Sequence, residues 1–274
     1  MLNNQGNVNY GIFLPLLNVY GDQKTIDCFT QEAMFDGWLK AESALARAEA
    51  EESIIPVEMA EKIEQAAHIS SLDLKDFWEE TRNVGYPIIP LVNRLAEVAG
   101  EAGKYVHWGA TTQDIMDTGL ILQIKSVLNR LEQLLTDLGN ACATLCEQHA
   151  ETIQAGRTHG QQAVPITFGF KVSVWLEEIQ RHYLRLQEVK KRLLVGQLSG
   201  AAGTLATLGE KAPFVRKRYC NLLGLNEPQG PWHVARDIIV EFSNMEATIS
   251  GTVQKIAKEI ANLASTEIGE VFEF

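Results

Sequence analysis

Apolar residues recur at helical spacing along three long stretches of the chain. They step by three and four positions over residues 120–145, again over 172–193 and a third time over 238–263. Each stretch runs for about 30 residues with few helix breakers, so at 1.5 Å per residue each predicts a helix of about 45 Å. Helices of this kind bury their apolar faces against one another, and the pattern therefore predicts an elongated bundle.

The first hundred residues carry shorter periods. Residues 29–52 predict one amphipathic helix, and residues 53–68 predict another, with Pro56 near its first turn. No alternating strand pattern of useful length is evident. We therefore expect an all-α fold, with a small N-terminal helical domain at residues 1–104 and a central long-helix bundle at residues 105–274.

Composition narrows the class of protein. The 274 residues are 46% hydrophobic and 22% charged, with a formal net charge of −11, which is typical of a soluble globular protein and argues against nucleic acid as a partner. The N-terminus has no basic start, and no apolar run reaches the length of a membrane span, so we expect neither a signal peptide nor a membrane protein. The four cysteines then predict free thiols in the cytoplasm.

Three residues with metal-binding side chains lie on one side of the first long helix. Cys142, Cys146 and His149 continue an apolar row, and unpaired cysteine is among the most buried residue types. No second ligand pair has a recognisable spacing, so we expect no metal.

The turn "YVHWGATTQDIMDT", residues 105–118, precedes the first long helix. Thr111, Thr112 and Asp114 are residues expected to cap a helix N-terminus. One hydroxyl suffices for a cap, however, and here two threonines and Gln113 follow one another. Spare hydroxyls together with unpaired helix N–H groups can bind a carboxylate or a phosphate. The sequence alone leaves a capping turn and an anion site both open.

The segment "AGRTHGQQAVPITFG", residues 155–169, precedes the second long helix. Pro165 is expected to open that helix, which places His159 in the connecting loop. A single histidine is more often structural than catalytic. Thr158 and Gln161 beside it supply the orienting partners that an acid or base requires, and they favour a catalytic role.

The segment "GQLSGAAGTLATLG", residues 196–209, is rich in glycine. Its spacing differs from G-x-G-x-x-G, and it follows a helix instead of a strand, which excludes a dinucleotide-binding loop. We expect a flexible turn whose backbone approaches a ligand, with Ser199 and Thr204 as hydrogen-bond donors.

The chain resembles the fumarase/aspartase superfamily in consecutive blocks, which read "VHWGATTQDIMDT", "GRTHGQQAVPITFG", "GQLSGAAGTLATLG" and "KIAKEIANLASTEIGEVFE". The likeness is greatest to the branch that contains adenylosuccinate lyase and 3-carboxy-cis,cis-muconate cycloisomerase, and it covers essentially the whole chain. It implies an L-aspartase/fumarase-like fold, no cofactor, and a homotetramer whose active sites combine turns from different subunits.

The resemblance also implies roles for individual residues. Thr111 and Thr112 match a region that binds a substrate carboxylate, and His159 matches the proposed general acid, with Thr158 beside it. The substrate contacts that we assign in addition are His107, Gln113, Asp114, Gln161, Ser199 and Thr204. The superfamily removes a proton next to a carboxylate, passes through an aci-carboxylate dianion and expels the group on the adjacent carbon. Fixed donors such as the threonine turn suit that developing charge.

Several segments separate the two members of the branch. Adenylosuccinate lyases carry a histidine in the segment that corresponds to "TRNVGYPIIPLV", which has none, and their Arg-Tyr phosphate contact is not evident near "YGDQKTIDCFTQE". In contrast, "YPIIPLV", "HWGATTQD" and "PWHVARD" resemble the cycloisomerase side. We therefore expect a small polycarboxylate substrate and a cycloisomerase-like elimination or addition, with adenylosuccinate lyase as the alternative.

Two further alternatives stay open. Arg236 either binds a substrate anion or forms an interhelical pair with a nearby acid such as Asp237 or Glu241. The protein itself is either an enzyme or a catalytically inactive helical scaffold or oligomerisation module. The presence of His159 together with the two threonines argues against a scaffold.

The last expectation concerns the C-terminus. In the superfamily, a segment like "TEIGEVFE" is followed by a serine-rich loop of the type G-S-S-x-M-P-x-K-x-N-P, which holds the proposed general base. This sequence ends at Phe274 without such a loop. We therefore expect the N-terminal part of a longer enzyme, with the C-terminal part missing and no lyase activity in this chain alone.

Overall fold

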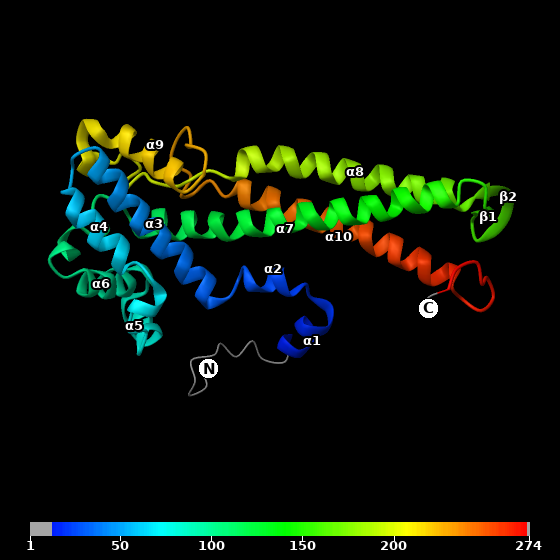
Figure 1. Ribbon diagram of the computed structural model, residues 1–274, viewed down its shortest axis with the longest axis horizontal. Helices are drawn as coiled ribbons and strands as arrows, with labels where there is room; N and C mark the ends of the chain where they lie inside the picture. The colour runs from blue at the N-terminus through cyan, green and yellow to red at the C-terminus, as the bar shows by residue number, and fades with distance from the viewer. Residues whose placement is uncertain (1–12, 273–274) are drawn as a thin grey trace. The chain divides into compact units, whose positions relative to one another are not determined.

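The computed structural model describes residues 13–272, which are predominantly helical (Figure 1). The α-helices are α1 (Phe13–Tyr20), α2 (Gln23–Asp27), α3 (Gln31–Glu51), α4 (Val57–Ala66), α5 (Phe77–Val84), α6 (Ile88–Ala99), α7 (Thr112–Gln148), α8 (Phe168–Leu193), α9 (Ala212–Leu222) and α10 (Asp237–Leu263). Short 3₁₀ helices span Ile69–Ser71, Gly100–Tyr105 and Ala206–Lys211, and one hairpin pairs β1 (Ile153–Thr158) with β2 (Gln161–Thr167). The prediction of an all-α fold with long helices is confirmed, and the hairpin is the exception.

The described residues form two compact units. The first contains the chain up to Val127 together with Leu194–Arg236, and the second contains Leu128–Leu193 and Asp237 onward. Helix α7 runs through both units. The sequence-based division between residues 104 and 105 stays a prediction.

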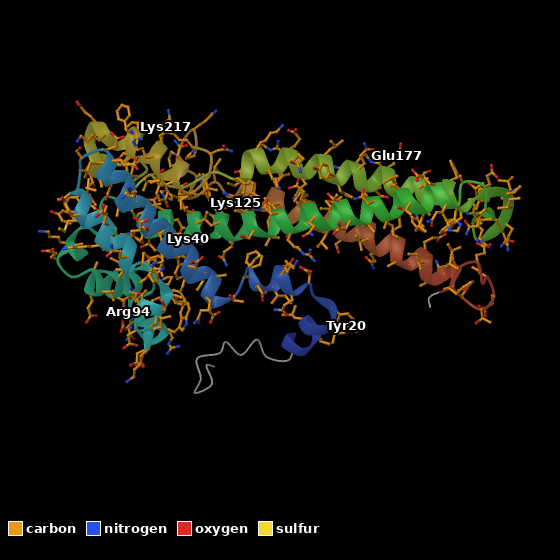
Figure 2. The ribbon with its side chains drawn as sticks, viewed as in Figure 1. Tyr20, Lys40, Arg94, Lys125, Glu177 and Lys217 are labelled. Atoms are coloured by element: carbon orange, nitrogen blue, oxygen red, sulfur yellow. The ribbon has the colours of Figure 1, made fainter. Side chains whose placement is uncertain are left out.

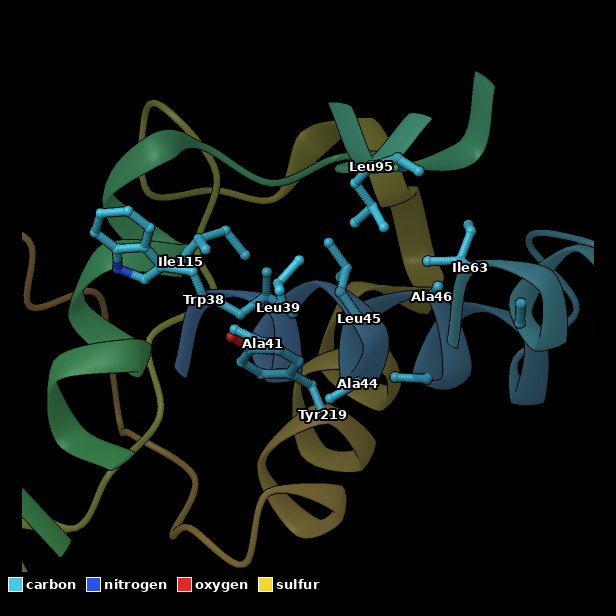
Figure 3. Packing of buried hydrophobic residues seen from close by; sticks show 14 of the residues in the cluster. Trp38, Leu39, Ala41, Ala44, Leu45, Ala46, Ile63, Leu95, Ile115 and Tyr219 are labelled. Atoms are coloured by element: carbon cyan, nitrogen blue, oxygen red, sulfur yellow. The ribbon is translucent and has the colours of Figure 1, made fainter. Parts of the chain in front are cut away.

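Helix α3 is the centre of the first unit and packs against α4 and α9. Its buried side chains alternate between large residues, such as Phe35 and Leu45, and a series of alanines that lets the neighbouring helices approach closely. Side chains from α4, α6, α7 and α9 converge on it (Figure 3). Helix α9 is amphipathic in the same way, since Lys217 extends into solvent (Figure 2) and Tyr219, two residues later, is fully buried.

The crossing of α3 and α7 depends on two glycines. A Cβ atom at Gly119 would lie 2.6 Å from Cδ1 of Trp38, and a Cβ atom at Gly37 would lie 3.0 Å from the carbonyl oxygen of Gly119. The first distance is too short for a side chain, and the second would require the neighbouring backbone to shift. The two helices therefore approach closely enough to place the first residues of α7 against the core of the first unit.

In the second unit, α8 and α10 pack together along their apolar faces. The buried residues on α8 include Val172, Trp175, Ile179, Leu186, Val189 and Leu193, and those on α10 include Phe242, Met245, Ile249, Ile256 and Leu263. These are the periodic positions that predicted both helices. None of the helices among the described residues combines the length and the apolar character needed to cross a lipid bilayer.

The segment around His159 differs from the prediction, because Pro165 lies inside β2 and α8 begins at Phe168. Thr158 pairs with Gln161, so His159 and Gly160 form a two-residue turn, with φ angles of 50° and 72°. Positive φ at both positions is the geometry of a type I′ hairpin turn. Proline suits the first turn of a helix and the edge of a two-stranded ribbon equally well, which is why the sequence signal was misleading.

Candidate active site

The turn before α7 is stabilised from within by Asp114. The Thr111 backbone N–H donates to Asp114 Oδ2 at 3.0 Å, and the Asp114 N–H donates to the Thr111 carbonyl oxygen at 3.0 Å. This is the acidic half of a capping box, in which the third helical residue accepts from the capping backbone. The hydroxyls of Thr111 and Thr112 have no hydrogen-bond partner within residues 13–272 and are partly exposed, so both are available to a ligand.

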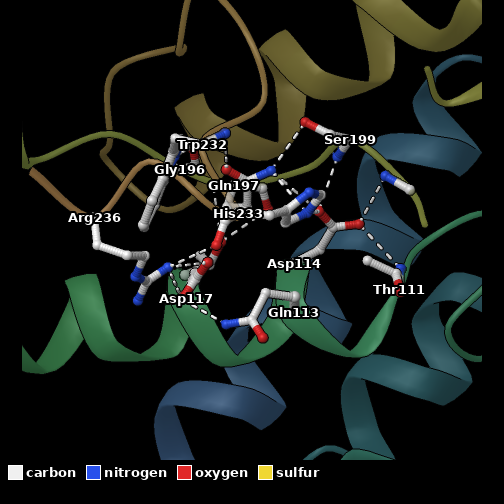
Figure 4. Close-up of polar contacts among 12 residues, drawn as sticks. Thr111, Gln113, Asp114, Asp117, Gly196, Gln197, Ser199, Trp232, His233 and Arg236 are labelled. Carbon is white, nitrogen blue, oxygen red and sulfur yellow. Dashed lines mark hydrogen bonds and ion pairs between the residues drawn. The ribbon is translucent and has the colours of Figure 1, made fainter. Parts of the chain in front are cut away.

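Asp114 also binds the glycine-rich loop of residues 196–209. Its Oδ1 accepts from the Ser199 backbone N–H at 2.9 Å, and its Oδ2 accepts from the Gly200 N–H at 2.9 Å (Figure 4). The imidazole of His233 contributes a further contact, with Nε2 at 2.8 Å from Oδ1. The Asp114 side chain is 0% exposed. Asp114 therefore joins three segments that are distant in sequence, and it fixes the geometry of the turn.

A close backbone approach brings the first turn and the glycine-rich loop together. Gly109 and Gly200 both have positive φ, at 73° and 70°. A Cβ atom at Gly200 would lie 3.3 Å from the Gly109 carbonyl oxygen, and one at Gly109 would lie 2.8 Å from a methyl of Leu208. The backbone of this loop therefore packs against the α7 turn, and its predicted approach to a ligand stays a prediction.

Gln197 fixes the other side of Asp114. Its side-chain oxygen accepts from the Trp232 backbone N–H at 3.0 Å, and its amide donates to Ser199 Oγ at 2.9 Å. Its backbone N–H and carbonyl both bond to the Thr118 hydroxyl, at 3.0 and 2.9 Å. Ser199 is therefore buried and committed within the protein, whereas Thr204 is exposed on the same loop.

Arg236 forms an ion pair, with a partner that the sequence did not suggest. Its Nη1 donates to both carboxylate oxygens of Asp117, at 2.9 and 2.8 Å, and its guanidinium lies 5.4 Å from the centre of the Trp232 ring. Asp117 is buried and also accepts from the Gln113 amide at 2.8 Å. Neither Asp237 nor Glu241 is the partner, and much of the Arg236 charge is neutralised by Asp117.

His107 lies at the start of the same turn, with a positive φ of 61°. Its Nδ1 is 2.6 Å from Oε1 of Glu42, a fully buried carboxylate on α3. Burial lowers the pKa of the His107 imidazole, but the charge of Glu42, its hydrogen bond to the ring and the charge of Asp114 together raise it by more, so the net shift of the pKa is upward.

The residues around His159 belong to the second unit. Thr158, His159 and Gln161 are exposed at the tip of the hairpin. Strand β1 is held by Glu270, which accepts from Arg157 at 2.5 and 2.9 Å and from Gln154 at 2.7 Å. The Arg157 hydrogen bond also holds the pKa of the Glu270 carboxyl below its usual value. The structure therefore collects the predicted residues in two groups, one at the α7 turn and one at the hairpin tip.

Three residues of the first group escaped the sequence analysis as site residues. Glu42 carries a detectable signal, because it lies next to Ala41 on the inner face of an amphipathic helix, where a charge is out of place. Gln197 and His233 carry none, since only the folded chain brings them to Asp114. Among residues 13–272, no group of three or more histidine, cysteine, aspartate or glutamate side chains could hold a metal ion.

Comparison with known proteins identifies relatives along nearly the whole chain. Residues 21–274 match the protein family described as Lyase. The chain is 43% identical to 3-carboxy-cis,cis-muconate cycloisomerase of Pseudomonas aeruginosa, over 89% of this chain and 54% of that enzyme. It is 41% identical to adenylosuccinate lyase of Pyrococcus abyssi, over 94% of this chain and 58% of that enzyme.

A solved structure gives the same result. The crystal structure of 3-carboxy-cis,cis-muconate lactonizing enzyme from Pseudomonas putida matches with a TM-score of 0.91 and 39% sequence identity, over 94% of this chain and 60% of that one. The chain thus spans between about half and three fifths of the length of these relatives.

Proposed function

Because the chain belongs to the lyase family of the fumarase/aspartase superfamily, we propose that it carries the carboxylate-binding part of an active site for β-elimination or addition on a small polycarboxylate. The observation that carries the proposal is the α7 turn. Two threonine hydroxyls stand at a helix N-terminus, and Asp114 fixes the turn from behind. Thr111, Thr112 and Gln113 contact the substrate in this proposal.

The chemistry of the superfamily fits such a turn. When a proton leaves the carbon next to a carboxylate, charge develops on the carboxylate oxygens and forms an aci-carboxylate. Donors that are already oriented stabilise that charge without having to reorganise. The partial positive charge at the helix N-terminus adds to the effect.

We propose that His159 transfers the proton to or from the departing group, with Thr158 and Gln161 beside it. Its place in an exposed two-residue turn supports contact with another molecule. The two predicted groups belong to different units of the chain. In this proposal a second copy of the chain supplies the group that completes each site.

The exposed apolar residues of the second unit support assembly into a homotetramer. Large apolar side chains on α8 and α10 are exposed in the single chain, and they are Phe170, Val174, Leu184, Val240, Val253 and Ile260. Exposed apolar surface of this kind marks an interaction face. We propose a homotetramer in which the α7 turn of one subunit meets the hairpin tip of another.

Within the class, we propose a carboxymuconate-type substrate first and adenylosuccinate second. The segments "YPIIPLV" and "PWHVARD" and the 43% identity to the Pseudomonas aeruginosa cycloisomerase favour the first, and the 41% identity to the Pyrococcus abyssi lyase supports the second. Since the chain spans only part of the length of these relatives, binding is a more direct readout than turnover.

Thermal unfolding of the 274-residue protein tests the proposal with a panel of ligands: 3-carboxymuconate, adenylosuccinate, argininosuccinate, fumarate and aspartate. We expect 3-carboxymuconate to raise the Tm most, and a Thr111→Val/Thr112→Val variant to lose the response. A larger rise in Tm with adenylosuccinate than with 3-carboxymuconate would favour an adenylosuccinate-type substrate instead. No response to any of the ligands would contradict a carboxylate site at this turn and leave a scaffold role.

A further inference from the structure

Two histidines border the α7 turn, and a buried carboxylate holds each of them through one ring nitrogen. His107 Nδ1 contacts Glu42 at 2.6 Å, and His233 Nε2 contacts Asp114 at 2.8 Å. The side chains of both carboxylates are 0% exposed, whereas the imidazoles are 20% and 16% exposed. Each ring is thus fixed on its inner side and accessible in part.

The contacts of Asp114 determine the tautomer of His233. Backbone N–H groups donate to both oxygens of Asp114, so the carboxylate is an acceptor and His233 Nε2 must carry the hydrogen. The Gln197 amide nitrogen, 2.9 Å from the same ring nitrogen, is also a donor, and its two hydrogens have other acceptors in Ser199 Oγ at 2.9 Å and Asp114 Oδ1 at 3.4 Å. His233 Nδ1 is then the free ring atom, without a partner within residues 13–272.

His107 is bound to its carboxylate through the other ring nitrogen. Because a carboxylate accepts only, Nδ1 carries the hydrogen that bonds to Glu42, and Nε2 has no partner within residues 13–272. The two rings therefore present different nitrogens beside one turn. When an imidazole is protonated, its free nitrogen becomes a second N–H donor, and a carboxylate on the other side of the ring stabilises the positive charge.

The charge balance of the turn calls for such donors. Asp114 places a full negative charge at the start of α7, whereas a helix N-terminus offers only about half a positive charge. Arg236 is engaged with Asp117. The charged and titratable groups around the two imidazoles are Glu42 of α3, Asp114 and Asp117 of α7, Tyr219 of α9 and Arg236. An incoming polycarboxylate needs further positive charge.

We propose that His107 and His233 each take up a proton when a polycarboxylate binds at the Thr111–Thr112 turn, and that they hold it through His107 Nε2–H and His233 Nδ1–H. Each ring gains its proton from solvent and keeps its hydrogen bond to Glu42 or Asp114. This inference rests on the proposed function, because it assumes that the turn binds a carboxylate. It assigns His233 as a substrate-contacting residue and Asp114 and Glu42 as positioning residues.

The test is nitrogen-15 NMR of the histidine rings in the 274-residue protein, with tricarballylate as the probe and its neutral triamide as the control. In the free protein we expect His233 as the Nε2–H tautomer and His107 as the Nδ1–H tautomer. Tricarballylate should move both nitrogens of each ring to imidazolium shifts at a pH where the free rings are neutral. The triamide should not.

Variants give a second readout. His233→Gln should weaken tricarballylate binding about ten- to hundredfold, the range for a hydrogen bond to a charged group. His68→Gln, on an exposed residue outside the turn, should match the wild type. The ring shifts need no variant, so they decide the question even where His233→Gln folds poorly.

The outcomes distinguish the proposed protonation of the two histidines from the proposed carboxylate binding at the turn. If tricarballylate moves the Thr111 and Thr112 amide signals while His233 stays neutral, the turn binds carboxylate and the histidine proposal is overturned. If the threonine amides do not respond at all, the proposed function fails, and this inference fails with it. A free His233 in the Nδ1–H tautomer would also contradict the proposal, before any ligand is added.

Discussion

The two units of the chain use carboxylates in opposite ways. In the first unit, Glu42, Glu49, Asp114 and Asp117 are buried, and Asp114 accepts hydrogen bonds from three separate segments. In the second unit, carboxylates lie near the surface and pair with lysine or arginine between helices, as in Lys171–Glu259, Lys255–Glu178, Arg192–Glu241 and Lys190–Glu132. The first arrangement fixes loops in one geometry, and the second holds long helices in register.

The difference has an energetic consequence. Removal of a buried carboxylate leaves its donors without partners in a medium of low polarity, which costs several kcal/mol. Removal of one partner of a surface pair exposes the other to water, at little cost. Single substitutions of the buried acidic residues of the first unit should therefore be costly, and substitutions of the surface acidic residues of the second unit should be tolerated.

The largest effect on stability is expected for Asp114→Ala. The substitution removes the acceptor of three backbone N–H groups and of His233, and we expect the free energy of unfolding to fall by about 3–5 kcal/mol. Urea denaturation measures the change. Glu177→Ala, on the exposed face of α8, is the control and should change stability by less than about 0.5 kcal/mol. Equal effects of the two substitutions would remove the contrast between the units.

The next prediction concerns His159 of the second unit, which is exposed, whereas Asp114 of the first unit is buried. For His159→Gln in a complete, active form of the enzyme, we expect turnover to fall by about two to four orders of magnitude, with little change in helical content, since the side chain projects from a hairpin turn. A turnover assay and circular dichroism on the same sample measure both. Near-normal turnover would refute the acid–base role of His159.

Glu49 should make stability depend on pH. Burial raises its pKa to about 9, the charge of Glu42 adds to the rise, and neither carboxylate oxygen has a hydrogen-bond partner among the described residues. A carboxyl whose pKa is higher in the folded state favours folding when protonated. Its contribution is complete below the unfolded pKa of about 4.5 and is lost as the pH rises towards 9.

Glu49→Gln tests this directly. In the wild type, the free energy of unfolding should decline by as much as about 1.4 kcal/mol per pH unit between pH 5 and 9. The Glu49→Gln variant should show no such decline, and at pH 8.5 it should be more stable than the wild type. Urea titrations at a series of pH values measure the slope. Parallel curves for wild type and variant would show that Glu49 does not titrate in this range.

The smallest effect is expected for Lys190→Met in the second unit. Lys190 pairs with Glu132, which also accepts hydrogen bonds from Tyr183 and Gln187. The Lys190 hydrogen bond is the main cause of the lowered pKa of Glu132, so its contribution to stability is present above about pH 4.5 and is lost as the pH falls below that value. We expect a loss of less than about 1 kcal/mol at pH 7. A loss as large as that of Asp114→Ala would refute the comparison.

The helices were predictable because burial leaves a periodic trace in the sequence. Val172 and Ile179 on α8, and Met245 and Ile249 on α10, recur at helical spacing whatever else the chain does. The hairpin was not predicted because Pro165 is compatible both with the first turn of a helix and with an edge strand. The short strands also leave only a weak alternating pattern in the sequence.

The candidate site was predictable only in part. Thr111 and Asp114 have a local signal, since capping residues act within one turn of their helix. His233 and Gln197 reach Asp114 from 119 and 83 positions away, and no local pattern records a contact of that span. The sequence could therefore indicate the α7 turn as a candidate carboxylate site, but not the side chains that support it.

The contacts of Asp114 also bear on how the chain folds. Its bonds to Ser199, Gly200 and His233 close loops of 85, 86 and 119 residues, whereas helices such as α3 form from contacts four residues apart. The chain must lose the entropy of closing those loops before any of the bonds can form. We therefore expect the α7 turn to reach its final geometry late in folding. Substitutions at Asp114 should then accelerate unfolding more than they slow folding. The main effect in such a variant is a shorter lifetime of the folded state.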